Sequence, residues 1–324
     1  MTQVAIIGAG LAGLTLAREL VQAGLSVQVF DKGRVPAGRM STRERDGGTF
    51  DHGAQYFTAR EPDFQREVEA WVARGLAAEW RGRFGTLTRG SVVPKHDGPA
   101  RYVGVPGMSA VARALASGLD VRSGVKVARA RREQTGWALT AETGEALGHF
   151  ERVAVAVPAP QAALLLEDTP ELAARAAAVV MEPCWAAMVR FEAPVALPLD
   201  GVFVHDSPLT WAARDSAKPG RAPGEHWVLH ASPVFSREHL ETLPGDMAPR
   251  LVEAFARALG GALPPGEAVA HRWRYAQAEP PLSEGALWDA ARGVGVCGDW
   301  CAGSRVEGAF LSGRALAHRL LTRP

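Results

Sequence analysis

The residues best suited to chemistry begin near the N-terminus. Residues 8–13 read GAGLAG, a G-x-G-x-x-G segment that follows an apolar run and opens a helical pattern. Gly8 permits a tight turn, Gly10 lets the backbone approach a pyrophosphate, and Gly13 lets a helix pack on a strand. Asp31 ends the next apolar run, 18 residues after Gly13, where its carboxylate can accept hydrogen bonds from a ribose. This spacing predicts a dinucleotide site, for NAD or for FAD.

A second segment, DHGAQYF at residues 51–57, places an acid, an imidazole, a glycine and an amide close together. Two interpretations are open: a catalytic cluster, or part of the cradle that holds the dinucleotide. Adjacent side chains on an extended backbone point to opposite faces, which disfavours a catalytic dyad of Asp51 and His52.

Two further segments favour FAD over NAD. Residues 38–40 read GRM and offer Arg39 to a second phosphate. Near the C-terminus an apolar run ends at Asp299, and a helix begins near Gly308. Asp299 is placed to bond a ribityl chain or a phosphate-linked sugar, while the N-terminus of the helix faces an electron-rich ring. An enzyme that binds only a nicotinamide nucleotide does not need a third chain segment to contact that nucleotide. The longer, bent FAD molecule does.

A parallel sheet is needed to position these residues. Residues 4–7 form a short all-apolar run ended by glycine, which is typical of a strand buried on both faces. With the helix and strand that follow, they make one βαβ unit of roughly 30 residues. The other expected elements are helices over 11–23, 62–78, 162–179 and 247–259, a helix within 105–118 that begins after the Pro-Gly at 106–107, strands over 27–30, 185–191, 211–213, 227–231 and 268–276, a β-meander over 121–158 that returns to the parallel sheet through 153–157, and a strand, turn and helix over 293–321.

The pattern predicts two domains that are interleaved along the chain. The predicted fold class is α/β, with a Rossmann-like nucleotide domain and an inserted α+β substrate domain built on an antiparallel sheet. The nucleotide domain is expected over 1–75, 105–163 and 277–324, and the substrate domain over 76–104 and 164–276.

Composition excludes several classes of partner. Lys+Arg 36 against Asp+Glu 35 leaves a formal charge of +1, which gives no electrostatic signal for nucleic acid or acidic membranes. The N-terminus lacks a basic region before its apolar run, and glycines interrupt that run, so we expect no signal peptide, no membrane span and a cytoplasmic protein. Three cysteines suit a reduced compartment, and the C-x3-C spacing of Cys297 and Cys301, without a second pair, predicts no zinc site.

These motifs together resemble a known family. The G-x-G-x-x-G opening, DKGRVPAGRMSTR at 31–43, DHGAQYFT at 51–58, HRWRYAQ at 271–277 and the GDW…RVEGAFLSG tail resemble the flavin-containing amine oxidase superfamily, and within it the renalase family, especially its bacterial members. The resemblance spans nearly the whole chain and is least distinctive inside the inserted domain. Ala37 departs from the family pattern, which usually has a glycine there, and leaves Arg39 in place.

The resemblance implies a glutathione-reductase-like fold with non-covalent FAD and answers the question about DHGAQYF. In this family the segment lies along the flavin, where Gly53 and Ala54 would allow a close approach to the ring. Cys297 and Cys301 would then be buried structural thiols rather than a flavin attachment site. The expected FAD contacts are Gly8, Gly10, Leu11, Ala12, Gly13, Asp31, Lys32, Gly38, Arg39, Met40, Gly53, Ala54, Gln55, Tyr56, Val127, Asp299, Gly308 and Ala309.

The resemblance also implies an activity. Renalase-like proteins are expected to oxidise 2-dihydro, and in some members 6-dihydro, isomers of NAD(P)H, with hydride transfer to flavin N5 and reduction of O2 to H2O2. Such a donor becomes aromatic on losing hydride, so no base has to remove a proton, and positioning in a dry pocket suffices. Amine oxidases of the superfamily carry an active-site lysine in the second half of the chain, whereas here Lys218 lies in a Pro/Gly-rich stretch with no lysine after it.

The wall of the substrate pocket is expected to come from the inserted sheet and from the strand over 268–276. Trp273 and Tyr275 share one face of that strand by its two-residue period, and Arg274 faces the other way. The expected partners are a small dihydropyridine nucleotide and O2, with no nucleic acid and no membrane; the oligomeric state is not predicted. Alternatives are an FAD oxidase or desaturase for an amine or cyclic alkene, and a redox-silent FAD-binding protein. The pocket candidates are His230, Trp211, Trp273, Tyr275 and Gln55.

Overall fold

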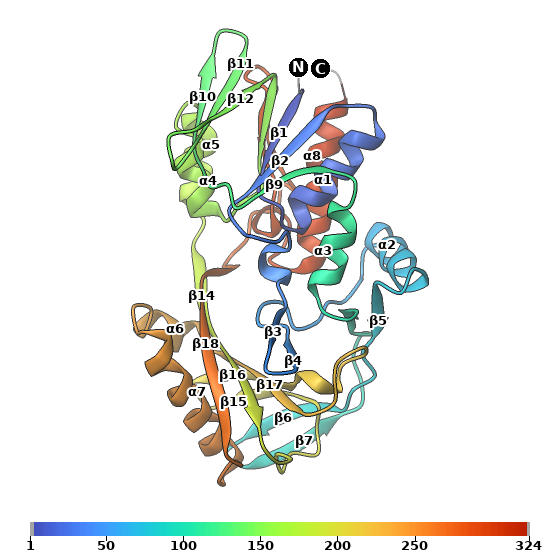
Figure 1. The fold of residues 1–324 in the computed structure, drawn as a ribbon, viewed down its shortest axis with the longest axis vertical. Coiled ribbons are helices and arrows are strands. Elements are labelled where there is room, and N and C mark those ends of the chain that lie inside the picture. The colour runs from blue at the N-terminus through green and yellow to red at the C-terminus, as the bar shows by residue number, and fades with distance from the viewer. Residues whose placement is uncertain (1–2, 323–324) are drawn as a thin grey trace.

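The G-x-G-x-x-G segment follows the central strand of a six-stranded sheet. The computed structural model describes residues 3–322, and this sheet forms the core of its upper lobe (Figure 1). The strand order is β19-β20-β13-β1-β2-β9, and all neighbouring pairs are parallel except β19 with β20. The strands are β1 (Val4–Ile7), β2 (Val27–Asp31), β9 (Asp120–Ser123), β13 (Arg152–Val155), β19 (Leu287–Asp289) and β20 (Val294–Val296).

Both faces of this sheet are covered, as the apolar run of β1 predicts. Val4 and Ile6 belong to a buried cluster that includes residues of α1 (Leu11–Gln22) and α8 (Val306–Leu321), whereas Ala5 and Ile7 belong to the cluster on the opposite face. Alternate side chains of one strand therefore enter two different cores. The helices on the first face are α1 (Leu11–Gln22), α3 (Ser109–Ala116) and α8 (Val306–Leu321).

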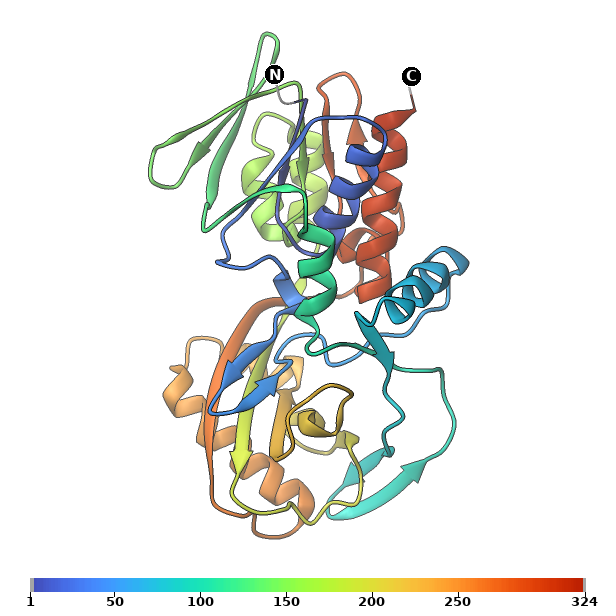
Figure 2. The same ribbon diagram turned by 45° about the vertical axis from the view of Figure 1, so that its right-hand side comes forward.

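The opposite face carries a three-stranded meander and two short helices (Figure 2). The predicted helix over 162–179 is wrong, because two helices replace it. Pro170 has no N–H and disfavours a helical conformation at Thr169, so the first helix ends before this pair and the second begins at the proline. The meander is also shorter than expected, because its first predicted strand, β9, pairs in parallel with β2. The elements are β10 (Val127–Glu133), β11 (Gly136–Ala141), β12 (Ala146–Phe150), α4 (Ala159–Leu165) and α5 (Pro170–Ala177).

The lower lobe is built on a seven-stranded sheet in the order β18-β14-β17-β16-β15-β6-β7. Its strands are antiparallel except for the pair β15 and β6. Two long strands, β14 and β18, reach from this sheet to the upper lobe in both ribbon views. The strands are β6 (Phe84–Thr88), β7 (Ser91–Lys95), β14 (Met181–Phe191), β15 (Gly201–His205), β16 (Leu209–Arg214), β17 (Glu225–Ala231) and β18 (Gly266–Ala278).

Two helices cover one face of the lower sheet. The core between sheet and helix includes Trp185, Trp227, Leu251 and Phe255. The helices are α6 (Pro233–Glu238) and α7 (Pro244–Leu259). The division of the chain into domains at residues 75, 104, 163 and 276 stays a prediction.

Small elements join the lobes. The predicted helix over 62–78 is too long: α2 (Pro62–Ala73) ends before Gly75, which has a φ of 69°, and Ala77 already belongs to a strand. Among residues 3–322, no helix has the length and apolar character to cross a bilayer. The joining elements are β3 (Arg43–Arg45), β4 (Gly48–Phe50), β5 (Ala77–Glu79), β8 (Tyr102–Gly104) and the 3-10 turns η1 (Gly38–Met40), η2 (Asp215–Ala217) and η3 (Asp299–Cys301).

Candidate functional site

The three glycines of the first motif have three different surroundings. A Cβ on Gly13 would lie 2.0 Å from the carbonyl oxygen of Gly8, and a Cβ on Gly8 would lie 2.4 Å from that of Ala156. Gly8 and Gly13 therefore allow the strand, turn and helix to pack. A Cβ on Gly10 would meet no atom of residues 3–322 within 4 Å. The space beside Gly10 is open at the N-terminus of α1, where no side chain in the described part of the chain caps the helix, so the free N–H groups can bind an anion.

Asp31 shapes the loop that would hold the ribose. Its carboxylate accepts from the backbone N–H of Ala9 at 2.6 Å and from that of Gly33 at 2.6 Å. Each carboxylate oxygen retains a lone pair for a further donor. Asp31 can therefore fix the glycine turn and bind ribose hydroxyls together.

Arg39 and Asp299, two predicted FAD contacts from distant parts of the sequence, contact each other. The guanidinium donates to both carboxylate oxygens of Asp299, at 2.9 and 2.5 Å, and to the carbonyl of Ala276 at 2.9 Å. Gly38 brings the same loop against Gly10, because its Cβ would lie 3.2 Å from the Cα of Gly10. The cradle is thus assembled from the first βαβ unit, residues 38–40 and the C-terminal segment.

The other predicted cofactor residues lie in varied surroundings. Leu11, Ala12 and Met40 are buried, Lys32 is exposed, and Val127 is buried in the core between the meander and the sheet. Gly308 allows α8 to pack close to the turn before it, since its Cβ would lie 2.7 Å from the carbonyl oxygen of Ala302. Ala309 follows it and is half-buried.

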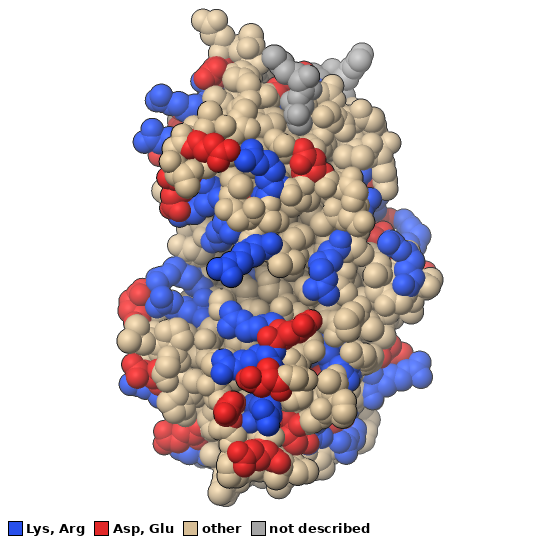
Figure 3. All heavy atoms as spheres, viewed as in Figure 1, with Lys and Arg blue, Asp and Glu red and all other residues tan. Residues whose placement is uncertain are grey.

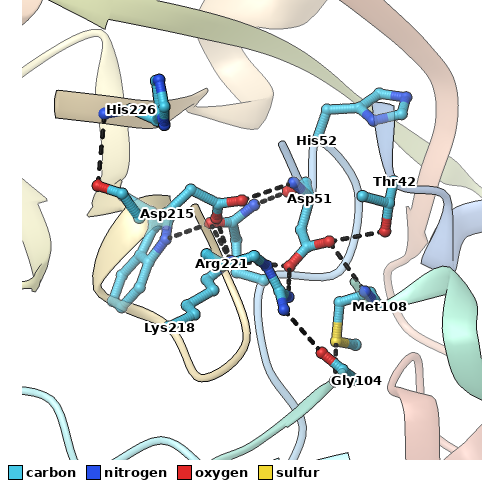
Figure 4. A network of polar contacts seen from close by, with 12 residues as sticks. Thr42, Asp51, His52, Gly104, Met108, Asp215, Lys218, Arg221 and His226 are labelled. Atoms are coloured by element: carbon cyan, nitrogen blue, oxygen red, sulfur yellow. Dashed lines mark hydrogen bonds and ion pairs between the residues drawn. The ribbon is translucent and has the colours of Figure 1, made fainter. Parts of the chain in front are cut away.

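The DHGAQYF segment is held at its first residue, Asp51, by a network of polar contacts (Figure 4). Asp51 is fully buried and accepts from the Thr42 hydroxyl at 2.8 Å, the Met108 N–H at 2.9 Å and Arg221 at 2.5 Å. Its own N–H donates to Asp215 at 2.8 Å. Asp51 therefore anchors the segment to α3 and to the loop at 215–221, and it is not part of a catalytic dyad with His52.

The close approach at Gly53 is made by the protein itself. A Cβ on Gly53 would lie 2.1 Å from the carbonyl oxygen of Arg39, and the N–H of Ala54 donates to that oxygen at 2.9 Å. The glycine is required for the packing of two backbone segments, whatever ligand lies beside them.

Lys218 is a residue whose place the sequence did not reveal. It is fully buried, contacts Asp215 as an ion pair, and lies 3.3 Å from Asp51 Oδ2 and 3.4 Å from Gln55 Oε1. Its ammonium is also 5.4 Å from the centre of the Trp80 ring. The Pro/Gly-rich composition predicted only a loop here; the neighbouring Asp215 and Arg221 are the signal that a buried charge network was possible.

The charges of this network balance one another. Burial alone would raise the pKa of Asp51, but Lys218, Arg221 and the Met108 N–H offset it and hold that pKa below its ordinary value. For Asp215, burial and the neighbouring Asp51 raise the pKa, and Lys218 offsets this only in part. Two carboxyl groups and two cations therefore share a site from which water is excluded.

Beside this network lies a cluster of imidazole and indole rings. The His52 ring stacks on the Trp273 ring, with 5.1 Å between the ring centres. It meets the His271 ring edge-on, with 4.8 Å between the ring centres. The His52 carbonyl accepts from Trp273 Nε1 at 2.8 Å and lies 3.2 Å from His230 Nε2. In the described part of the chain, no group of three or more His, Cys, Asp or Glu side chains is arranged to hold a metal ion.

All three histidines of this cluster are neutral near pH 7. Burial is the largest cause in each case, and it lowers the pKa of His52 to about 3 and those of His230 and His271 to about 4. The cluster thus presents uncharged rings to whatever lies against it.

The predicted pocket residues do not all meet. Trp211 donates from Nε1 to Gln55 Oε1 at 3.3 Å, and its ring packs against Tyr56 at 5.5 Å. Tyr275 is half-buried, and the pairing of β14 with β18 is irregular between Trp273 and Gln277. This irregularity removes the basis for placing Tyr275 on the face of Trp273, since a bulge breaks the two-residue alternation.

Three other side chains settle minor points. Arg274 is partly exposed and forms an ion pair with Glu241. This ion pair gives Arg274 a structural role. Cys297 and Cys301 are buried, and burial raises the pKa of both thiols, that of Cys297 to about 12.

Comparison with known proteins identifies the family. Residues 77–321 match the family described as flavin containing amine oxidoreductase, and residues 6–74 match the NAD(P)-binding Rossmann-like domain. Because the first match covers more than half of the chain, the protein belongs to the flavin containing amine oxidoreductase family. It is an FAD-dependent oxidoreductase.

Solved structures share the fold at low sequence identity. A chain from Exiguobacterium sp. 255-15, provisionally named protoporphyrinogen oxidase, superposes with a TM-score of 0.80 and 14% identity, over 99% of this chain and 98% of that one. A variant of putrescine oxidase superposes with a TM-score of 0.72 and 15% identity, over 99% of both chains.

Curated relatives match only a short segment. These include 4,4'-diapolycopene oxygenase from Methylomonas sp, 43% identical over 56 residues, and hydroxyneurosporene desaturase from Rubrivivax gelatinosus, 43% identical over 58 residues. The matches cover 17% and 18% of this chain and 11% of each relative. Since this chain matches about a tenth of their length, their activities carry over only as proposals.

The residues of the cradle fit FAD. The open space at Gly10 faces an uncapped helix N-terminus, which suits a pyrophosphate. Asp31 retains acceptor capacity for a ribose, and Arg39 and Asp299 lie together where the C-terminal segment returns. The buried Nδ1 of His52 has no hydrogen-bond partner among residues 3–322, which leaves it for a bound ligand.

Proposed function

We propose that the protein is a renalase-like oxidase of dihydronicotinamide isomers: it removes a hydride from a 2-dihydro or 6-dihydro isomer of NAD(P)H and releases NAD(P)+. When bound, FAD supplies the hydride acceptor and passes the electrons to O2, which becomes H2O2. The chain's own residues bind the donor, orient it and exclude water.

This proposal rests mainly on one observation: the ammonium group of Lys218 is already engaged by acceptors of the protein. The group has three donors, and three acceptors surround it, on Asp51, Asp215 and Gln55. An amine oxidase of the superfamily uses its lysine to hold a water at the flavin. Here the ammonium is already engaged and has no exposed surface, so the site lacks the feature that amine oxidation would need.

The neutral ring cluster supports the same reaction. A dihydropyridine loses hydride to become an aromatic cation, so no N–H or O–H proton has to be removed by a base. The rings of His52 and Trp273 stack on each other and His271 meets both edge-on, so the donor ring can lie against an uncharged aromatic cluster. The role of this part of the chain is positioning and desolvation, which are sufficient for a donor of this kind.

The surface between the two lobes suits an anionic substrate. On the face viewed in Figure 3, Lys and Arg side chains gather between the two lobes, near the place that β3 occupies in Figure 1. Arg43 of β3 is one of the charges that, after burial, lower the pKa values of His52 and His271. In the described part of the chain Arg43 forms no ion pair, so it is available for the phosphates of a dinucleotide whose ring lies at the cluster.

The rate of flavin reduction by a dihydropyridine isomer is expected to vary little between about pH 6 and 9. The pKa values of His52, His230 and His271 lie near 3 to 4, so these rings stay neutral throughout that range and protonate only well below it. Stopped-flow absorbance at each pH, with NAD(P)+ identified as the product, tests the proposal. An amine substrate would instead give a rate that rises with pH as the amine loses its proton, and that result would favour amine oxidation.

A further inference from the structure

The partners of Gln55 leave one choice for the orientation of its amide. Its Oε1 lies 3.3 Å from Trp211 Nε1 and 3.4 Å from Lys218 Nζ, and neither group can accept a hydrogen bond. Its Nε2 donates to the backbone carbonyl of Asp51, which cannot donate. Exchanging oxygen and nitrogen would place donors against donors, so the amide is held in one orientation.

This arrangement leaves one N–H group of the Gln55 amide for a further hydrogen bond. Both lone pairs of its oxygen are engaged, and one of its two N–H groups is engaged. The second N–H has no partner within residues 3–322. Lys218 thus acts as a positioning residue: its charge holds the oxygen of Gln55, and any ligand that meets the amide meets a donor.

His230 offers the complementary group. Its Nε2 faces the carbonyl oxygen of His52 at 3.2 Å, so Nε2 carries the proton. Because the ring is neutral near pH 7, its Nδ1 then carries a free lone pair. Trp211 of β16 and His230 of β17 are cross-strand partners, so their side chains lie on the same face of the sheet. Trp211 donates to Gln55, which brings the Gln55 amide to that face.

We infer that the N–H of Gln55 and the Nδ1 of His230 form a recognition pair for a primary carboxamide, with Gln55 donating to its carbonyl oxygen and His230 accepting from its NH2 group. This inference rests on the proposed function and specifies the part of the substrate that is recognised: the carboxamide on the pyridine ring. A ligand with a carboxylate at this position would place an oxygen against the lone pair of His230 and bind poorly.

Binding of oxidised ligands to the FAD-loaded protein tests the pair without turnover. NAD+ carries the carboxamide, whereas its 3-acetylpyridine analogue keeps the carbonyl and lacks the NH2 group. The wild-type protein is expected to bind NAD+ about three- to tenfold more tightly than the analogue. In His230→Phe this preference should disappear, while Gln55→Met should weaken both ligands by a similar factor and keep the preference.

Flavin content and melting temperature are measured for both variants, and Gln55→Glu and His230→Leu serve if either first variant does not fold. Equal affinity of the wild-type protein for both ligands, in a protein whose flavin is still reduced by a dihydro isomer, would overturn the carboxamide pair and leave the proposed function standing. If neither ligand binds and no isomer reduces the flavin, the proposed function fails and the inference fails with it.

Discussion

Lys218→Met is expected to lower the free energy of unfolding by about 3–5 kcal/mol. Lys218 has no exposed surface and contacts two buried carboxyl groups, Asp51 and Asp215. Removing its charge leaves Asp215 without a cation in contact, while Arg221 still pairs with Asp51. Urea unfolding of the wild type and variant measures the difference, and the flavin content of the variant should fall because the DHGAQYF segment loses its anchor.

A matched control is Lys126→Met. Lys126 pairs with Glu142 at the surface, where both side chains are more than half exposed, so its replacement is expected to change stability by less than about 1 kcal/mol. If Lys218→Met proved as mild as Lys126→Met, the buried network would not be what holds this segment in place.

Two alanine substitutions in the first motif are expected to fail for different reasons. A Cβ at position 13 would lie 2.0 Å from the backbone of Gly8, so Gly13→Ala should force the helix off the strand and cost about 1–3 kcal/mol or more of stability even without cofactor. A Cβ at position 10 would have no described residue within 4 Å, and Gly10 has an ordinary φ of −76°. Gly10→Ala should therefore fold normally and lose FAD affinity by about tenfold or more, because the methyl group occupies the place of the pyrophosphate.

Unfolding of the apoproteins and FAD titration separate the two effects. An apo Gly10→Ala protein that is as unstable as Gly13→Ala would mean that the open space at Gly10 is a packing contact and not a ligand cradle. Undiminished FAD binding by a stable Gly10→Ala protein would place the pyrophosphate elsewhere.

The fold could be predicted where local patterns and burial agree. The apolar run of β1, the glycine turn and Asp31 predicted the parallel sheet, because a strand buried on both faces has a composition of its own. The prediction of one helix over 162–179 is wrong because the alanine-rich pattern continues across Pro170, whereas the helix cannot continue through the proline. Strands β6, β7 and β15 were not predicted, since half-buried strands in loop-rich sequence carry little signal.

The site was predictable only as far as motifs extend. Arg39 and Asp299 were both assigned to the cofactor from their neighbours in sequence, but their contact with each other depends on the return of a distant strand. The sequence around Lys218 indicates a loop, and the burial of this side chain against Asp51 is a property of the tertiary fold. Tyr275 was assigned by the two-residue period of a regular strand, and the irregular pairing of β18 removes that basis.

Anaerobic mixing of the purified yellow protein with four kinds of donor shows which of them reduces the flavin. The flavin absorbance should bleach rapidly with 2-dihydro- or 6-dihydro-NAD(P), slowly or not at all with ordinary NADH, and not with amines such as putrescine, and the colour should return when air is admitted. Rapid bleaching by an amine, with none by either dihydropyridine isomer, would contradict the account and assign the protein to amine oxidation.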